Sequence, residues 1–327
     1  MIISRTPFRV SFFGGGTDFP DFYREYNGAT LSTTINQYCY ISLHRLSPFF
    51  KHRFRASYAK TEQVQTPSEF QHPLIRECLL FLNTKNNVEI SHVADLPGQT
   101  GLGSSSSFTV GLLHALHSLQ GEAISAEQLA KEAITVERER VGDAGGHQDQ
   151  YAAAYGGMLR INYASDKITV RRLDLTESRL QDFEDHLMMF YTGIDKSAQI
   201  IQREQQEQVK RNNKILHEML HMVDDAEQIL IRNTDIRDFG MLLHETWVRK
   251  KTLSNGISNS DIDRTYHAAR EAGALGGKLL GAGGRGFLLL FAESQYHKAI
   301  RQRLAKLKEV TFSFSLKGSH ILFQGDT

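Results

Sequence analysis

The stretch from Pro97 to Ser107 reads PGQTGLGSSSS, and the fold prediction depends on it. An apolar run of helical length follows, from Phe108 to Leu119. Glycines let a backbone approach a ligand closely, and the first N–H groups of a helix are free to bind an anion. We therefore interpret the segment as a phosphate-binding loop that leads into the N-terminus of a helix.

The phosphate ligands expected in this loop are backbone N–H groups and hydroxyls. A serine hydroxyl can also take one position on a Mg²⁺ ion whose other ligands are phosphate oxygens and water. A flexible Gly/Ser linker is the alternative, but the apolar helix directly behind the loop argues against it. The Walker pattern GxxxxGK[ST] is absent, so the chain is not an ordinary P-loop nucleotide hydrolase. The residues expected to contact nucleotide are Pro97, Gly101, Leu102, Gly103, Ser104, Ser105, Ser106 and Ser107.

The composition is that of a globular protein whose length suits two domains. Of the 327 residues, 40% are hydrophobic and 23% are charged, and the net charge is +1. So small a net charge does not favour nucleic acid or an acidic membrane as the main partner. Only Cys39 and Cys78 are present, outside any ligand spacing, so we expect no disulfide framework and a cytoplasmic location. The sequence contains no run of about 18 apolar residues, so it predicts no membrane span.

The order of predicted elements differs between the two halves of the chain. The first half is largely β at its start, and a capping-box pattern at Ser125 and Gln128 begins a helix that runs to about Arg140. Beyond Asp174 the order is β, α, β, β, α, β, which is the ferredoxin-like motif. Its strands are expected over 187–191, 278–280, 287–291 and 310–314. We predict an α+β protein with one domain over 1–180 and a second over 181–327.

A second glycine cluster, GAGGRG, spans Gly281 to Gly286. It matches GxGxxG by letter, but a dinucleotide fingerprint must open a helix, whereas this cluster joins two predicted strands. A tight hairpin explains it, either alone or with close ligand contact through Gly283 and Gly284. The sequence leaves both alternatives open.

A third cluster, at the end of the first strand, contains Gly16, Thr17 and Asp18. A short helix is expected over 19–26, and Asp18 could cap its N-terminus. It could equally present a carboxylate to sugar hydroxyls. We name Gly16, Thr17 and Asp18 as candidate substrate-binding residues.

The acidic segment VERERVGDAGGHQDQ, from Val136 to Gln150, supplies two candidate carboxylates. Phosphoryl transfer needs one carboxylate for a metal and another to orient or deprotonate the attacking hydroxyl, and Glu137 and Asp149 could fill these roles. The alternative is a solvated helix face for Glu137 and a first-turn acid for Asp149. His147 lies beside Asp149, yet it has no partner in a catalytic spacing, so we favour a non-catalytic role.

Three separated motifs resemble those of the GHMP kinases. They are TPFRVSFFGGGTD, PGQTGLGSSSS and KLLGAGGRGF, and the resemblance covers nearly the whole chain. It implies an ATP-dependent kinase with an N-terminal ribosomal-S5-like domain and a C-terminal ferredoxin-like domain. Arg285 departs from the third motif, which usually has glycine there.

The resemblance also implies roles for single residues. Asp149 matches the catalytic aspartate, Arg9 the basic residue beside the transferred phosphate, and Asp18 a carboxylate that holds sugar hydroxyls. Glu137 and Ser105 match the Mg²⁺ ligands. The basic residues Arg249, Lys250 and Lys251 are interpreted separately, as a solvated helix end.

Within the superfamily, GGGTD, GHQDQ and the segment YTGIDKSA from Tyr191 resemble the heptose 7-phosphate kinases. That likeness implies phosphorylation of the anomeric hydroxyl of D-glycero-D-manno-heptose 7-phosphate to the 1,7-bisphosphate. The 7-phosphate needs cationic donors, for which Lys196, Arg5 and Arg285 are candidates.

Two alternatives remain open at this stage. One is a kinase of an unphosphorylated sugar such as fucose or galactose. The other is a sugar sensor of the same fold without turnover. In each case the expected partner is a small-molecule sugar or sugar phosphate, with no nucleic acid or membrane, and a homodimer is compatible with the sequence.

Overall fold

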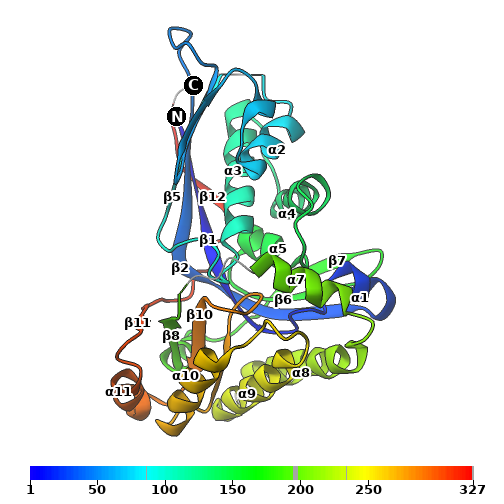
Figure 1. Ribbon diagram of the computed structural model, residues 1–327, viewed down its shortest axis with the longest axis vertical. Helices are drawn as coiled ribbons and strands as arrows, with labels where there is room; N and C mark the ends of the chain where they lie inside the picture. The colour runs from blue at the N-terminus through cyan, green and yellow to red at the C-terminus, as the bar shows by residue number, and fades with distance from the viewer. Residues whose placement is uncertain (86, 194–197, 233, 326–327) are drawn as a thin grey trace.

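The computed structural model describes residues 1–85, 87–193, 198–232 and 234–325. Two β-sheets organise these residues, one in the upper part of Figure 1 and one in the lower part. Both sheets carry helices, and the mixture confirms the predicted α+β class.

The first sheet is built on two long strands that open the chain. Strand β1 pairs antiparallel with β2, an 18-residue strand whose first part also pairs with β6 and whose last part pairs with β5. The sheet order is β12-β1-β2-β5-β3-β4, and β7 is joined through β6. Its strands are β1 (Ile2–Phe13), β2 (Gly28–Arg45), β3 (Phe54–Ser57), β4 (Thr61–Val64), β5 (Val88–Ala94), β6 (Met158–Tyr163), β7 (Ile168–Arg172) and β12 (His320–Gln324).

Helices α2 to α5 lie on one side of this sheet (Figure 1). Helix α3 packs directly on β1 and β2, and it is buried along most of its length because its apolar residues surround the helix. The helical segments are α1 (Pro20–Tyr26), η1 (Pro67–Glu69), α2 (Pro73–Phe81), α3 (Ser104–Gln120), α4 (Ala126–Ile134), η2 (Thr135–Arg140) and α5 (Gln148–Tyr155).

The second sheet has the order β11-β8-β10-β9 with all neighbours antiparallel. This order and the helix positions are those of the predicted ferredoxin-like motif. Its strands are β8 (Leu187–Tyr191), β9 (Gly276–Leu279), β10 (Phe287–Phe291) and β11 (Lys308–Glu309). The helices of this half are α6 (Glu177–Asp185), α7 (Ala198–Glu207), α8 (Asn213–Ile231), α9 (Arg237–Lys251), α10 (Ser260–Glu271) and α11 (Ser294–Arg303).

Buried aromatic rings join the two sheets. Phe12 of β1 lies 5.2 Å from Phe183 and 5.5 Å from Phe239, measured between ring centroids. Phe183 and Phe239 both contact Phe291 of the second sheet. Rings of this size bury much apolar surface, so the two halves are packed against one another through a common core.

The last predicted strand is misplaced in the sequence analysis. Instead of a strand over 310–314, the sheet partner of β8 is β11, and Phe314 forms an isolated bridge with Ile35 of the first sheet. Phe314 also contacts Phe183, and the apolar residues Val310, Phe312 and Phe314 are partly buried against the core. The strands β6, β7 and β12 are not anticipated, and β12 returns the chain to β1, so the domain division at 180 and 181 stays a prediction.

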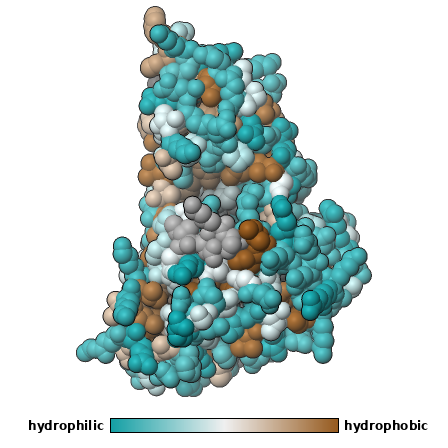
Figure 2. Space-filling view, in the orientation of Figure 1, coloured by the Kyte–Doolittle hydropathy of each residue, from teal (hydrophilic) through white to brown (hydrophobic). Residues whose placement is uncertain are grey.

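No helix among the described residues is long and apolar enough to cross a membrane. The face in Figure 2 is mostly hydrophilic, with hydrophobic residues in small groups. Cys39 and Cys78 are buried and unpaired with one another, as expected for a chain without a disulfide framework.

Candidate active site

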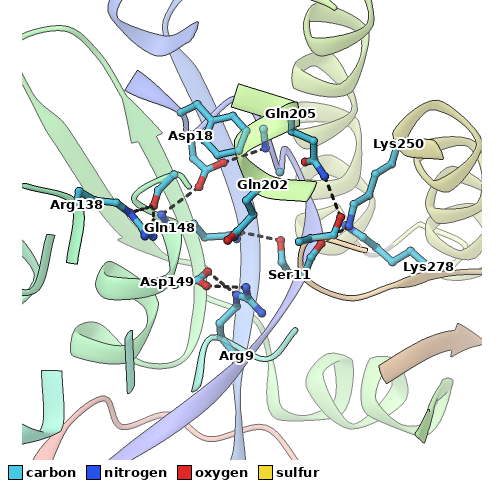
Figure 3. A pocket seen from close by; sticks show the side chains of 16 residues that line it. Arg9, Ser11, Asp18, Arg138, Gln148, Asp149, Gln202, Gln205, Lys250 and Lys278 are labelled. Atoms are coloured by element: carbon cyan, nitrogen blue, oxygen red, sulfur yellow. Dashed lines mark hydrogen bonds and ion pairs between the residues drawn. The ribbon is translucent and has the colours of Figure 1, made fainter. Parts of the chain in front are cut away.

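A polar pocket lies where β1, α5, α7, α9 and the β9–β10 connection meet (Figure 3). It encloses about 560 Å³, part of which is open to solvent. The described residues that line it are Arg9, Ser11, Gly15, Gly16, Asp18, Phe19, Arg138, Gly146, Gln148, Asp149, Gln202, Gln205, Lys250, Lys278, Gly281 and Ala282.

The glycine-rich loop beside the pocket has the predicted form. Helix α3 begins at Ser104, directly after Gly103, which has a φ of 71° and serves as the N-cap. Gly101 has a φ of 84°, in the left-handed region that favours glycine. The loop therefore directs free N–H groups of a long helix toward one point, which suits an anion.

The cluster GAGGRG connects β9 to β10, which confirms that it is a hairpin connection and not a dinucleotide fingerprint. It packs tightly on the glycine-rich loop, because a Cβ on Gly101 would lie 2.3 Å from the carbonyl oxygen of Leu280. Gly283 and Gly284 do not line the pocket. They pack against Ile257, whose carbonyl accepts a hydrogen bond from the N–H of Gly284 at 3.0 Å.

The four serines divide into two outward and two inward side chains. Ser104 is half-buried and Ser105 is exposed. Ser106 and Ser107 are buried, and their hydroxyls donate to the Glu137 carboxylate at 2.9 Å and to the carbonyl of Pro7 at 2.8 Å. The serine that contacts Glu137 is thus Ser106, and the role of Ser105 as a Mg²⁺ ligand, which the family resemblance implies, stays a prediction.

Glu137 is buried, and the alternative of a solvated helix face is wrong for it. It lies in η2, a π-helical turn that interrupts the helix expected to run to Arg140, and such turns are frequent at functional sites. Its Oε2 accepts from Ser106 and from Gln150 Nε2 at 2.6 Å, while Oε1 has no hydrogen-bond partner among the residues that the structure describes. Burial raises the pKa of this carboxyl. A cation near Oε1 would satisfy the unpaired oxygen, so Glu137 and its serine neighbours fit a divalent metal.

Asp149 and Arg9 form a bidentate ion pair at the pocket. Arg9 Nε donates to Oδ1 at 2.7 Å and Arg9 Nη2 to Oδ2 at 2.8 Å. The remaining Arg9 nitrogen, Nη1, donates to the carbonyl of Gly101 at 2.5 Å. Asp149 lies in the first turn of α5, where the helix dipole favours a negative charge. The two predicted catalytic residues are therefore in contact and adjacent to the glycine-rich loop.

Asp18 lines the pocket but does not cap α1, whose N-cap is Phe19. Its carboxylate accepts from the N–H of Gly16 at 2.9 Å and from the N–H of Gln148 at 3.2 Å. Burial raises the pKa of Asp18, and the charge of Asp149 adds to the effect. Thr17 is buried and donates to the carbonyls of Gly14 and Ala29, so it supports the turn and does not line the pocket.

His147 is buried next to the site without lining it. Its Nδ1 lies 3.1 Å from the hydroxyl of Tyr23, and burial lowers the pKa of the imidazole to about 4. A histidine of this kind is neutral at pH 7, and its non-catalytic role stays a prediction.

Sequence reasoning missed Lys250 and Lys278, which line the pocket and are buried. Lys250 was assigned to a solvated helix end, and this is wrong. A signal was present, because Leu243, Thr246, Trp247 and Lys250 follow the spacing of one helix face, and all four are buried.

Two of the three cations named for a sugar phosphate, Arg5 and Arg285, do not line the pocket. Arg5 bonds to His320 and stacks over Tyr38 at 4.5 Å, and it does not line the pocket. Arg285 is exposed and lies 3.5 Å from Asp261. Lys196 and the rest of residues 194–197 in YTGIDKSA fall outside the described residues.

A glycine-rich loop at a helix N-terminus, a buried carboxylate and a carboxylate held by arginine are features that suit a nucleotide-dependent kinase of small molecules. Comparison with known families agrees. Residues 73–157 match the GHMP kinases N terminal domain and residues 228–309 match the GHMP kinases C terminal domain, together just over half of the chain. The chain belongs to the GHMP kinases, a family of ATP-dependent kinases.

Individual relatives span the whole chain. A D-glycero-alpha-D-manno-heptose 7-phosphate kinase from Campylobacter jejuni is 28% identical over 97% of both chains. A solved D-glycero-D-manno-heptose 1-phosphate kinase from Bacteroides thetaiotaomicron matches with a TM-score of 0.81 and 21% identity, covering 100% of both chains. Galactokinase from Lactococcus lactis, solved with galactose, matches with a TM-score of 0.78 and 15% identity over 98% of this chain and 94% of that one.

Proposed function

We propose that this protein transfers the γ-phosphoryl group of ATP to the anomeric hydroxyl of a sugar. The substrate proposed is D-glycero-D-manno-heptose 7-phosphate, which would give the 1,7-bisphosphate. The observation that carries the proposal is the Arg9–Asp149 pair, placed between a polar pocket and the glycine-rich loop. The named substrate of the Campylobacter relative supports the choice of sugar.

Asp149 is the residue proposed to act on the attacking hydroxyl. Each of its oxygens accepts one hydrogen bond from Arg9 and keeps a further lone pair for the acceptor. Arg9 holds the carboxylate in one orientation, and its own position is fixed by the carbonyl of Gly101. Asp149 would orient the hydroxyl and take its proton as the new P–O bond forms.

The nucleotide phosphates are proposed to lie on the N-terminus of α3. There the backbone N–H groups after Gly103 and the half-buried hydroxyl of Ser104 are available. Glu137, together with Ser105 or Ser106, would hold Mg²⁺. This ion would supply neutralisation of the charge on the phosphate oxygens.

The walls of the pocket suit a polyhydroxyl acceptor. Asp18 and Gln148 lie on one side, and Gln202 and Gln205 of α7 lie on another (Figure 3). Carboxylate and amide groups can pair with several hydroxyls at once, whereas a purely apolar pocket would leave those hydroxyls unsatisfied. We propose that these residues contact the sugar ring.

The test is a coupled assay for ADP with ATP, Mg²⁺ and a panel of acceptors. The panel contains heptose 7-phosphate, heptose, fucose, galactose and mevalonate, and the product is examined by phosphorus NMR. We expect ADP with heptose 7-phosphate and a new anomeric phosphate signal. Turnover of only an unphosphorylated sugar would overturn the substrate assignment, and sugar binding without ADP would indicate a sensor.

A further inference from the structure

Two buried lysines reach the pocket from the second half of the chain. Lys250 comes from the last turn of α9 and Lys278 from β9, and their side chains lie together on one side of the pocket in Figure 3. Lys250 is 6% exposed and Lys278 is 2% exposed. Lysine is almost never so deeply buried without a partner, so the pair requires an explanation.

Neither ammonium group has a carboxylate partner among the described residues. Lys250 Nζ donates to the carbonyls of Leu279 and Gly281, and Lys278 Nζ donates to the carbonyl of Phe12 at 2.8 Å. An ammonium has three donors, so one donor of Lys250 and two of Lys278 remain for a ligand. The carbonyl contacts also fix the direction in which both groups point.

The other charged groups of the pocket are already engaged. Arg9 is paired with Asp149, and Arg138 donates to the carbonyl of Gly146 at 2.9 Å while lying 3.8 Å from Glu137. Asp18 accepts from two backbone N–H groups. The two lysine side chains are therefore the ionisable groups of the pocket that lack an oppositely charged partner within the described residues.

We propose that Lys250 and Lys278 form the subsite for a phosphate monoester carried by the acceptor sugar. The inference rests on the proposed function and assigns residues to the second phosphate of that substrate. A phosphate dianion would use the free donors of both lysines and offset the cost of their burial. Burial lowers the pKa of both lysines, that of Lys250 to about 7, so binding of a dianion should be accompanied by proton uptake.

The two lysines lie on one side of the pocket in Figure 3, and Arg9 and Asp149 lie on another side of the same pocket. The glycine-rich loop and Ser104 are on the side of Arg9 and Asp149, since Gly103 lies against both of those side chains. The lysines are anchored to the end of β1 and to the β9–β10 connection, which itself packs on Gly101 of the glycine-rich loop. An acceptor that spans the pocket would place its reacting hydroxyl at Asp149 and its own phosphate at the lysines.

The experiment measures the preference for a phosphorylated acceptor. Lys250→Met and Lys278→Met keep an unbranched apolar side chain and remove the ammonium group. Lys251→Met is the matched control, because Lys251 is the neighbouring residue and pairs with Asp263. With saturating Mg·ATP, kcat/KM is determined for heptose 7-phosphate and for heptose. We expect each pocket variant to lose roughly 10- to 100-fold with heptose 7-phosphate and less than about threefold with heptose, as charged hydrogen bonds imply. The control should keep the wild-type ratio of kcat/KM for heptose 7-phosphate to kcat/KM for heptose. The KM for ATP should be unchanged in all variants.

Other outcomes decide against the subsite. An equal loss with both acceptors would place the lysines on the transferred phosphate, and an unchanged ratio would remove them from phosphate binding. If the wild-type protein phosphorylates no sugar, the proposed function is contradicted but the subsite is not. Calorimetric binding of heptose 7-phosphate then tests the subsite. Proton uptake on binding of heptose 7-phosphate at pH 8 that disappears in Lys250→Met supports the subsite. Absence of heptose 7-phosphate binding by the wild type overturns the subsite. If a methionine variant fails to fold, Lys250→Gln and Lys278→Gln replace it.

Discussion

The carboxylate of Asp149 is held by the guanidinium of Arg9 through two hydrogen bonds of 2.7 and 2.8 Å, although 140 positions separate the two residues. Arg9 belongs to β1 and Asp149 to the first turn of α5. Because Arg9 also donates to the carbonyl of Gly101, one side chain connects the first strand, the glycine-rich loop and helix α5. Bidentate pairs of this kind have well-defined geometry, which is what a catalytic carboxylate needs.

Asp149→Asn should abolish most turnover while leaving ATP binding intact. The amide of asparagine lacks the negative charge, so the side chain loses its basicity. Its NH₂ group also faces the donors of Arg9, so the side chain loses the orientation that Arg9 gives to the carboxylate. We expect kcat to fall by roughly 10²- to 10⁴-fold, the usual contribution of a general base. Steady-state kinetics gives kcat, and calorimetric titration gives the affinity for ATP. Equal turnover in the variant would remove Asp149 from the mechanism.

The sequence predicts the parts of this site that have local patterns. The phosphate loop, the α3 helix and the ferredoxin-like order depend on glycines, on a long apolar run and on periodicity within one segment, and these are visible in the chain. The Ser125 cap of α4 is equally local, and its side chain accepts from the N–H of Gln128 at 3.1 Å. Each of these features is fixed by residues close in sequence.

What the sequence could not show depends on contacts between distant segments. The burial of Glu137 arises because Ser106 and Gln150 pack over its carboxylate, and a run of charged letters gives no sign of this. The strand β12 forms only because β1 offers an open edge to the end of the chain. Lys250 is buried because its helix face meets the β9–β10 connection, whereas its neighbours Arg249 and Lys251 are only half-buried.

The serine that supports Glu137 can be identified by its effect on Mg²⁺ dependence. Ser106 donates directly to the buried carboxylate, whereas Ser105 is exposed at the helix N-terminus. Ser106→Ala removes a hydrogen bond that orients Glu137, and loss of such a supporting partner typically costs about 10- to 100-fold in metal affinity. We expect the Mg²⁺ concentration for half-maximal activity to rise by that factor. The measurement is a Mg²⁺ titration of activity at fixed ATP, with Glu137→Gln as the reference for full loss.

Ser105→Ala is the companion variant. If Ser105 is itself a Mg²⁺ ligand, as the family resemblance implies, the same titration should shift for Ser105→Ala as well. A shift for Ser105→Ala alone would assign Ser106 a purely structural role. No shift for either serine would contradict the proposed metal site.

Gly146→Ala should damage the pocket through Asp18. A Cβ at position 146 would lie 1.9 Å from Oδ2 of Asp18, so the carboxylate must leave its hydrogen bonds to Gly16 and Gln148. We expect the free energy of unfolding to fall by about 1–3 kcal/mol, the usual cost of overpacking, together with a higher KM for the sugar. Urea denaturation and acceptor kinetics measure the two effects.

Gly98→Ala is the control for this substitution. Its Cβ would meet only Ser104 Oγ, at an ordinary 3.8 Å. The stability of this variant should remain within about 0.5 kcal/mol of the wild type. Equal stability and equal KM for the sugar in the two alanine variants would show that the position of the Asp18 carboxylate is not critical for stability or sugar binding.

Lys250→Met should change how stability depends on pH. Burial and the positive charge of Arg9 lower the pKa of Lys250 from 10.5 to about 7 in the folded protein, so between these values the unfolded chain binds more protons than the native one. Stability contributed by this position therefore rises with pH across that window, with a slope of at most about 1.4 kcal/mol per pH unit. Methionine does not titrate, so the unfolding free energy of the wild type minus that of the variant should increase from pH 7 to pH 9 and stay level below pH 6. Urea denaturation of both proteins at pH 6, 7, 8 and 9 provides the comparison, and a difference that is constant across the series would show that Lys250 remains charged throughout.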